Sequence, residues 1–484
     1  MGMGTTVYER QVEYLELKPE LFDSYLDFVE KTLKSIYTNR IKFSLRSTYG
    51  DKPALSLVIG VGDSEVEVLV VADRNPSYRV VALFGSQAFS LLNNIVQTIE
   101  GINLLYSETE GRGVVYFVFV PKMKITPPKY ESLAYKIFGR FLFGNLVFLF
   151  AFSLIIFSIF WFIFKEWTPV ALVLFQVPIL LIAHKILEYS LGDWVLSPSN
   201  RHVYLVGIKV PLERYNELLT KFFYPKRFEF KRKIYEETIR TGVEPSESYI
   251  RELLAEYGLP LEDVSIVIKS IDVYGMVKKV FSRMNLPVPR IIVSNIILPN
   301  AAATGVLHSF CGLLITTGLL TKLDEEEIEA VLAHEASHIR YRDPLILFIL
   351  SSIEYLTRIA IVYTFWHVFI TVPFLELIYL YFSITLLFFV SKFVEARADI
   401  DAAVALRKSQ KLASALKKIG SRRILREMKS GRLSAWLMWD NHPPITFRIE
   451  LLKRIGIESV GNPWTYAMKE CLKDFARAFS RSYL

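Results

Sequence analysis

The segment EEEIEAVLAHEASHIRYRD, residues 325–343, has the periodicity of an amphipathic helix and carries two histidines four positions apart. Acidic residues begin the segment and basic residues end it, an order that suits the helix dipole. His334 and His338 therefore lie one turn apart on one face, where two imidazoles can bind the same zinc ion. Glu335, next to His334, is placed to take a proton from an attacking water as a general base.

A catalytic zinc site needs a third protein ligand and one position left open for water. The downstream candidate lies in SKFVEARADIDAA, residues 391–403. We expect Glu395 to be the third ligand. Asp399 follows one helical turn later and points the same way, so we expect it to orient a ligand histidine by accepting its second N–H. The pattern predicts one Zn²⁺ per chain, bound by His334, His338 and Glu395.

The composition is that of a membrane protein. Hydrophobic residues make up 52% of the 484 positions and Phe occurs 35 times, which favours membrane-spanning segments. The net charge is +8, but no helix-turn-helix, zinc-finger or RNA-binding signature is present, so we expect a membrane surface rather than nucleic acid as partner. Two cysteines, Cys311 and Cys471, are too few for a disulfide framework or a thiolate zinc site. The N-terminus lacks the apolar core of a cleavable signal peptide.

Four apolar runs predict about four transmembrane helices in two hairpins. The first run is uncharged and long enough to cross a hydrocarbon core of about 30 Å. Short links join the runs in pairs, which suggests helical hairpins. The runs are Phe141–Phe164 with Thr168–Ile182, and Leu345–Ile370 with Leu375–Val390.

Charged residues near these runs predict how the chain is oriented. Within the third run, Glu354 and Arg358 are four positions apart and can pair on one helix face. That helix either stands partly out of the bilayer or turns the pair toward a polar cavity. The hairpin links carry almost no Lys or Arg, so the positive-inside rule places both termini and the catalytic site in the cytoplasm of a multi-pass plasma-membrane protein. The opposite ends of the runs carry Lys136, Arg140, Arg340, Arg342, Lys392 and Arg397.

The fold class predicted from these patterns is mixed. We expect a multi-pass α-helical membrane protein with a mainly α-helical zincin catalytic domain, of the gluzincin type, and an N-terminal α/β accessory domain. That accessory domain begins with a helix at Pro19–Tyr37 and ends with a strand from Gly113. The expected segments are an accessory domain at 1–125, a linker and first hairpin at 126–190, a first catalytic part at 191–343, a second hairpin at 344–391, and a second catalytic part with C-terminal helices at 392–484.

Several motifs, taken in order, resemble those of the HtpX-type membrane zinc metalloproteases, a family that also contains the CAAX prenyl proteases. Pro299–Gly305 resembles the family's NAxATG segment, and Thr317–Leu320 resembles its TGLL strand end. The HEASH and EARAD segments follow, and then His442-Pro443-Pro444 with Arg448. The similarity covers roughly residues 285–455, and together these motifs are far more specific than the two histidines alone.

The resemblance implies roles for the matching residues. The zinc ligands would be the three residues named above, with Glu335 as base. His442 and Arg448 would stabilise the oxyanion of the tetrahedral intermediate, since donors are needed where charge develops. The alternative for His442 is a buried turn histidine before two prolines. The segment expected to form an edge strand that pairs with an extended substrate is Asn300, Ala301, Ala302 and Ala303.

Asp343 has two possible roles. It could contact a ligand histidine, or it could cap the next helix together with Pro344. We favour the capping role, because an aspartate followed by proline is a typical helix start.

The resemblance implies a zinc-dependent endopeptidase that hydrolyses membrane or misfolded proteins in quality control, with polypeptide substrates and the lipid bilayer as partners. One alternative is a CAAX prenyl protease-like enzyme with the same chemistry. The four membrane runs are fewer than expected for that branch. An alternative of another class is a membrane scaffold with a vestigial metal site. The intact base, ligands and oxyanion candidates disfavour it.

Overall fold

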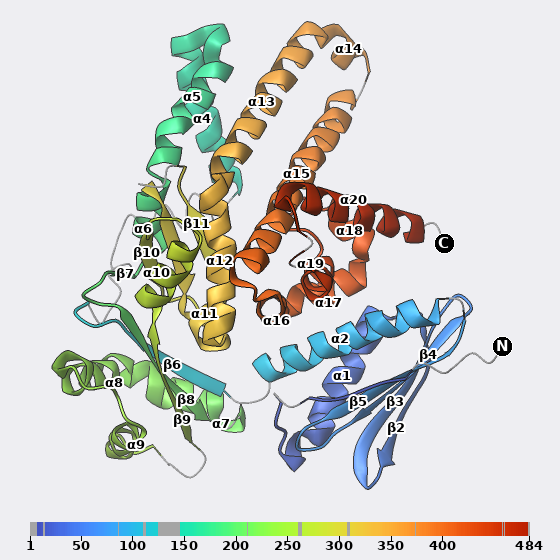
Figure 1. Cartoon of the computed structure of the whole chain (residues 1–484), viewed down its shortest axis with the longest axis vertical. Coiled ribbons are helices and arrows are strands. Elements are labelled where there is room, and N and C mark those ends of the chain that lie inside the picture. The colour runs from blue at the N-terminus through green and yellow to red at the C-terminus, as the bar shows by residue number, and fades with distance from the viewer. Residues whose placement is uncertain are drawn as a thin grey trace.

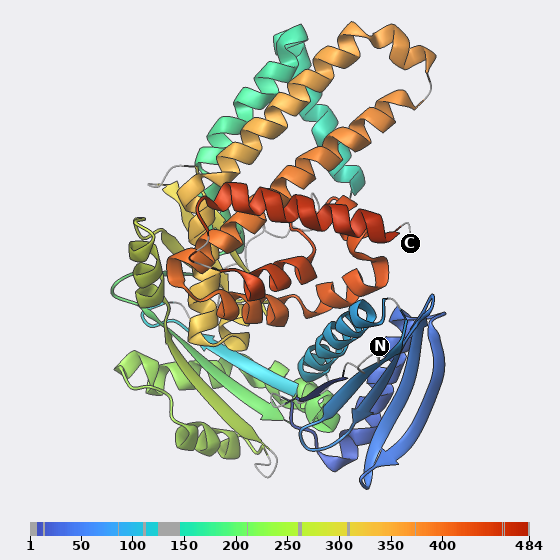
Figure 2. The ribbon, with the colours of Figure 1, turned by 45° about the vertical axis from the view of Figure 1, so that its right-hand side comes forward.

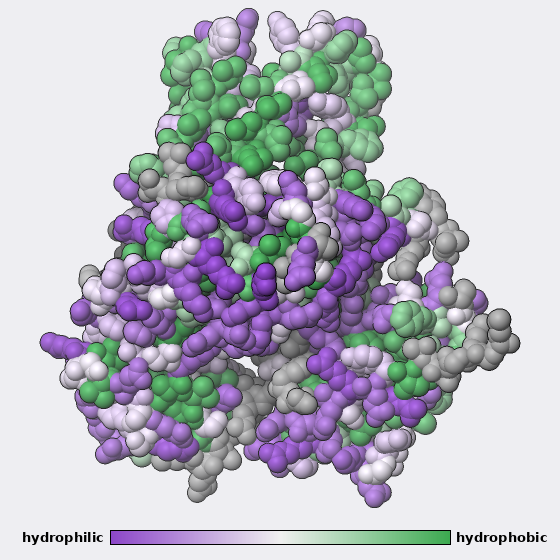
Figure 3. Space-filling model, viewed as in Figure 1, coloured by the Kyte–Doolittle hydropathy of each residue, from purple (hydrophilic) through white to green (hydrophobic). Residues whose placement is uncertain are grey.

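Over the residues that it describes, the computed structural model shows a mainly helical protein with three separate β-sheets and a bundle of apolar helices that projects from one end (Figure 1). Apolar side chains cover these projecting helices, whereas the rest of the visible face is largely polar (Figure 3). The structure describes residues 7–12, 15–85, 87–109, 113–123, 146–210, 212–259, 264–306, 310–372, 374–456, 458 and 460–482.

The projecting helices form the two expected hairpins. In the first, α4 (Leu146–Phe164) and α5 (Thr168–Leu181) are joined by the 3-10 turn Lys165–Trp167, and the rings of Phe160 and Phe175 lie 5.2 Å apart across it. Residues 141–145 of the expected first run lie outside the described residues. Three stretches of the described chain are long and apolar enough to span a membrane. They are Ala151–Leu181, Asp343–Thr364 and Leu375–Leu406.

The second hairpin contains a charged pair that the sequence predicted. It consists of α13 (Asp343–Thr364) and α15 (Leu375–Leu406). On α13, Arg358 Nε donates a 3.0 Å hydrogen bond to Glu354 Oε1. Ser383 Oγ on α15 donates to the same oxygen. The pair therefore neutralises its own charge inside an apolar helix and ties α13 to α15.

The N-terminal region is an antiparallel five-stranded sheet in the order β1-β5-β4-β3-β2 with two helices, α1 and α2. Alternate residues of the central strands are buried, as Leu57 and Val68 show, and Leu26 and Ile95 of the helices join them in one core. The bounds are β1 Val7–Gln11, a 3-10 turn Pro19–Leu21, α1 Phe22–Ile36, β2 Ile41–Tyr49, β3 Lys52–Val61, β4 Ser64–Val71, β5 Ser77–Phe84 and α2 Ala88–Thr109.

The strand that begins at Gly113 does not belong to that sheet, so this part of the expected accessory domain is wrong. β6 (Gly113–Phe119) pairs antiparallel with β8 (His202–Val210), which pairs with β9 (Ser265–Asp272). Val118 enters the core that also contains Ile328 and Leu332 of the helix with the two histidines. A strand's alternation predicts which of its faces is buried, but not which strand it pairs with.

A third sheet, in the order β11-β12-β10-β7, leads into the candidate site. β10 and β12 are parallel, and β11 is an edge strand paired antiparallel with β12. The chain then enters α11 (Thr317–Lys322) and α12 (Glu325–Tyr341). The strands are β7 Trp194–Leu196, β10 Arg290–Ser294, β11 Ala301–Thr304 and β12 Gly312–Thr316.

The remaining helices surround this sheet and α12. In the centre of the chain they are α6 Ala183–Leu191, α7 Leu212–Leu218, a π turn Leu219–Phe223, α8 Tyr224–Glu237, a 3-10 turn Ile239–Thr241, α9 Glu247–Glu256 and α10 Val273–Arg283. Toward the C-terminus they are α14 Trp366–Thr371, α16 Ser409–Ile419, α17 Ser421–Ser430, α18 Arg432–Leu437, α19 Ile445–Arg454 and α20 Pro463–Ser482.

The N-terminal region contacts the C-terminal helices through α2 (Figure 2). The side chain of Ile424 on α17 faces Gly101 of α2 closely. Beside it, Lys417 of α16 pairs with the buried carboxylate of Glu100. Arg10 of the N-terminal region also pairs with Glu100 at 2.6 Å, so this buried carboxylate has cationic partners from both regions.

The loop before β11 passes directly over Gly318, which gives a test of the fold. A methyl group there would overlap the carbonyl oxygen of Ile297. We predict that Gly318→Ala lowers the free energy of unfolding by about 1–3 kcal/mol, as expected for overpacking, measured as a lower melting temperature. Gly461→Ala is the matched control, because a methyl group there meets open space. Equal melting temperatures for both variants would contradict this packing.

Candidate active site

The local sequence sets both ends of α12, the helix that carries HEASH. At its start, the Asp324 side chain accepts from the Glu327 N–H, and the Glu327 side chain accepts from the Asp324 N–H, a reciprocal capping box. At its end, Arg342 adopts a left-handed conformation with φ 55°, which turns the chain directly into α13. His334 and Glu335 are both buried on this helix.

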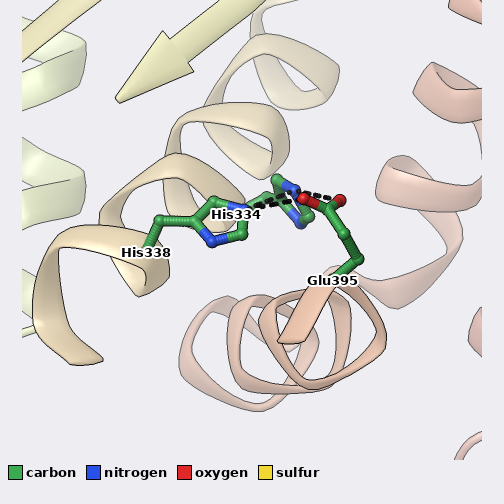
Figure 4. Close-up of side chains that lie close together, drawn as sticks. All are labelled: His334, His338 and Glu395. Carbon is green, nitrogen blue, oxygen red and sulfur yellow. Dashed lines mark hydrogen bonds and ion pairs between the residues drawn. The ribbon is translucent and has the colours of Figure 1, made fainter. Parts of the chain in front are cut away.

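His334, His338 and Glu395 converge from α12 and α15 (Figure 4). The two Nε2 atoms lie 3.2 Å apart. His334 Nε2 lies 3.5 Å from Glu395 Oε2, and His338 Nε2 lies 3.5 Å from Glu395 Oε1. The structure thus brings together the three residues that the sequence predicted as ligands, although they come from helices separated by a membrane hairpin.

These separations fit a zinc ion. Ligand atoms about 2.0–2.2 Å from a tetrahedral zinc lie roughly 3.3–3.6 Å from one another, close to the spacings found here. Burial lowers the pKa of His334, but hydrogen bonding and charge from Asp399 and Glu395 outweigh burial and raise it to about 10. A pocket that holds a proton so strongly favours a bound cation, and two imidazoles with one carboxylate are a donor set that zinc prefers.

Each imidazole has an aspartate oxygen close to its other nitrogen. His334 Nδ1 lies 2.9 Å from Asp399 Oδ1, in the position that the sequence predicted for Asp399. His338 Nδ1 lies 2.7 Å from Asp343 Oδ2. The favoured capping role for Asp343 is therefore wrong: Asp343 is already inside α13 and no side-chain capping bond is present there. The left-handed turn at Arg342 brings the carboxylate of Asp343 back to His338. The Nε2 atoms of His334 and His338 therefore both face Glu395.

Each of the two aspartates is in turn held by an arginine. Arg448 of α19 donates from Nε and Nη2 to the two oxygens of Asp399, at 2.7 Å each. Its Nη1 lies 3.5 Å from Glu395 Oε2. Arg397 of α15 donates to Asp343 Oδ2. Arg448 is thus part of the site as predicted, but most of its donors serve Asp399.

Glu335 lies against the edge strand that was predicted to bind substrate. The Ala303 N–H donates a 2.7 Å hydrogen bond to Glu335 Oε2. Ala301, Ala302 and Ala303 lie in β11, and Asn300 immediately precedes it, bonded through its N–H to Thr316 Oγ1. An edge strand is thus present at Ala301–Thr304, and its backbone N–H at Ala303 holds the carboxylate of Glu335.

His442 reaches the site from the loop before α19. Its Nδ1 lies 2.7 Å from Glu395 Oε2, and its side chain is 39% exposed. It is therefore not a buried turn histidine. The preceding segment is held by Lys392, whose Nζ donates to the carbonyls of Trp436 and Met438 at 2.9 and 2.7 Å. A cavity of about 40 Å³ beside His442 is lined partly by Pro443 and Pro444.

Two of the charges used to predict orientation have other roles. Lys392 and Arg397 are buried and bonded to protein groups, so they do not act as free charges at the membrane surface. Lys136 and Arg140 lie outside the described residues. Arg340 and Arg342 lie at the C-terminal end of α12, directly before the apolar helix α13. The roles of Lys392 and Arg397 were missed because their partners come from other helices, whereas contact of Asp343 with a ligand histidine was considered but not favoured. Only the proximity of Asp343 to His338 in the sequence gave a signal.

Comparisons with known proteins agree with this site. Residues 267–455 match the model of peptidase family M48. A protease HtpX homolog from Pyrococcus furiosus is 29% identical over 214 residues, which cover 39% of this chain and 74% of that protein. A protease HtpX homolog from Burkholderia cenocepacia is 44% identical over 73 residues, which cover 15% of this chain and 26% of that protein. This chain thus spans about a quarter of the length of the second relative.

A solved structure, that of S. mikatae Ste24p, covers 76% of this chain and 97% of its own, with 14% identity and a TM-score of 0.30, which is too low to support an argument about the fold. The family match and the relatives do support a class. Residues 267–455 are similar to the peptidase domain of family M48. The relatives that this part of the chain resembles are protease HtpX homologs.

The ligand geometry predicts the effect of removing the carboxylate. Glu395→Ala leaves two imidazoles, which bind zinc much more weakly than three ligands. We predict loss of zinc from the purified protein, measured by elemental analysis. Glu376→Ala is the control, because Glu376 is an exposed acid on the same helix. Normal zinc content in Glu395→Ala would remove Glu395 from the ligand set.

Proposed function

We propose that this protein is a zinc-dependent endopeptidase of the gluzincin type that hydrolyses peptide bonds of membrane or misfolded proteins at a membrane surface. The observation that carries the proposal is the ligand set of His334, His338 and Glu395, at zinc-like separations beside the buried Glu335 of α12, which accepts a hydrogen bond from the edge strand β11. A bound zinc would lower the pKa of its water toward about 7 and polarise the scissile carbonyl.

Glu335 is the proposed general base. It is adjacent in sequence to the ligand His334, and the Ala303 N–H holds one of its oxygens. The other oxygen is then available to accept a proton from the attacking water. The same carboxyl later gives this proton to the nitrogen of the departing amine, which restores the base.

The edge strand β11 is the proposed site for the substrate backbone. The Ala303 N–H points to Glu335 and not to β12. Backbone groups alternate along a strand, so those of Ala301 face the same open edge. An extended peptide can pair there as an added strand, which brings a scissile carbonyl close to Glu335. Asn300 and Ala302 would support this strand from within the sheet.

His442 is the proposed donor to the oxyanion. It is partly exposed and touches Glu395, so it lies at the edge of the reacting centre. Arg448 Nη1, the donor that Asp399 does not use, lies 3.4 Å from His442 Nδ1. Together they would provide positive charge where the carbonyl oxygen becomes negative.

The site's position supports a membrane-associated substrate. One uninterrupted helix, α15, contains both the apolar run and the ligand Glu395. The reacting centre is therefore fixed within a few helical turns of the span. We propose four membrane crossings, two in each hairpin. We also propose that the termini and the site lie in the cytoplasm, because Arg340 and Arg342 lie at the end of α12 next to the apolar helix α13.

The function is tested with purified protein and three substrates: casein, an unfolded membrane protein and a prenylated peptide. We predict zinc-dependent cleavage of the unfolded membrane protein that a chelator abolishes. Preferred cleavage of the prenylated peptide would favour a CAAX-type enzyme. Bound zinc without cleavage of any substrate would favour a scaffold.

Glu335→Gln distinguishes the role of the general base from that of the metal site in the same assay. We expect cleavage to fall to the chelated background while zinc content stays unchanged, because an amide cannot take a proton. Glu325→Gln, an exposed position on the same helix, should leave both unchanged. Full activity in Glu335→Gln would overturn the mechanism.

His442→Phe tests the oxyanion role. We predict a kcat about 10²–10³-fold lower, the effect of losing one oxyanion donor, with KM and zinc content little changed. Steady-state kinetics and elemental analysis measure these values. A variant with raised KM and normal kcat would assign His442 to substrate binding instead.

A further inference from the structure

Arg397 is a fully buried cation that belongs to no ligand set. Its side chain is 0% exposed, and it lies on α15 two residues after Glu395. Burying an unpaired guanidinium would be very costly, so each contact it makes has an energetic reason. Its surroundings are the start of α13, the face of α12 and the ring of Trp464 in α20.

The guanidinium is held in one orientation. Nη1 donates to Ser337 Oγ at 2.7 Å, and Nη2 donates to Asp343 Oδ2. The carbon of the guanidinium lies 4.1 Å from the ring centroid of Tyr341 and 5.0 Å from that of Trp464. Stacking between aromatic rings and a fork of fixed donors are properties of arginine that lysine does not share.

Asp343 Oδ2 is shared between this arginine and a ligand histidine. The same oxygen that Arg397 bonds lies 2.7 Å from His338 Nδ1. On the other side of the site, Arg448 bonds Asp399, whose Oδ1 lies 2.9 Å from His334 Nδ1. Each imidazole therefore lies next to an aspartate, and each aspartate is bonded to a buried arginine. The site thus contains two equivalent histidine–aspartate–arginine series of contacts.

We propose that Arg397 is a positioning residue for the metal site: it holds Asp343 against His338 and so keeps His338 Nε2 directed at Glu395. The inference rests on the proposed zinc function. Without the arginine, the Asp343 carboxylate loses its strongest partner and is free to rotate away from His338. Mutation of a residue that bonds a ligand histidine commonly lowers metal affinity by about 10–100-fold.

A simpler role for Arg397 is to balance the charge of nearby acids, including Asp401, which bonds Ser337. Arg340 offers the comparison, because it lies on α12 and its Nη1 is 3.3 Å from Asp401. Within the described part of the chain, the ion-pair partner of Arg340 is Asp401 and not Asp343. If charge balance were the role, removing either arginine would have a similar effect on the site.

The experiment measures zinc affinity by chelator competition and the visible spectrum of the Co²⁺-substituted protein, with no substrate present. We predict that Arg397→Met lowers zinc affinity roughly 10-fold or more and shifts the Co²⁺ spectrum. Arg397→Lys keeps the charge without the fork and should lie between wild type and Arg397→Met. Arg340→Met, the matched control, should bind zinc as wild type does.

A double variant tests the connection through Asp343. Asp343→Asn should lower zinc affinity alone, and adding Arg397→Met should cause little further loss, because both changes act through the same chain of contacts. If Arg397→Met does not fold, the zinc affinities and Co²⁺ spectra of Asp343→Asn and Arg397→Lys still test the proposal. The proposal would be overturned if Asp343→Asn had the zinc affinity and Co²⁺ spectrum of the wild type. It would also be overturned if the losses of zinc affinity in Asp343→Asn and Arg397→Met added up in the double variant. Wild-type protein that binds no zinc would instead overturn the proposed function.

Discussion

The burial of the Glu395 carboxylate between two imidazoles is the constraint on which the rest of the site depends. A buried carboxylate is stable only where positive charge and hydrogen-bond donors surround it. His442 and Arg448 provide such groups from the C-terminal part of the chain. The aspartates that orient the imidazoles add further negative charge, which Arg448 and Arg397 offset. Three carboxylates, those of Glu395 and the two aspartates, thus face two guanidinium groups, and the remaining negative charge favours a cation at the centre of the cluster.

The same constraint explains why two distant parts of the chain must pack together. α12 supplies the histidines, and α15 supplies Glu395 after the chain has passed through the second hairpin. Because α15 is one helix from its apolar run to the ligand, the hairpin also fixes the depth of the site relative to the membrane. The internal pair of Glu354 and Arg358, bonded to Ser383, keeps α13 and α15 in register within the apolar region.

The C-terminal helices connect the site to the N-terminal region. Glu427 of α17 accepts hydrogen bonds at the start of α19, from the N–H groups of Ile445 and Thr446, and so caps the helix that carries Arg448. α17 in turn packs against α2. The N-terminal region thus packs, through α2, against the helix that caps α19, and the ligands His334, His338 and Glu395 all come from other parts of the chain.

The sequence by itself determined the features that depend on local spacing. Helical periodicity places His334 and His338 on one face, the EARAD segment provides Glu395 and Asp399, and long apolar runs identify the hairpins. Only the tertiary structure decided the partners of Asp343, Arg397 and Lys392, and the sheet to which β6 belongs. The physical reason is that helix and strand periods fix which side of an element is buried. Which carboxylate meets which arginine depends instead on how α12, α13, α15 and α20 pack together.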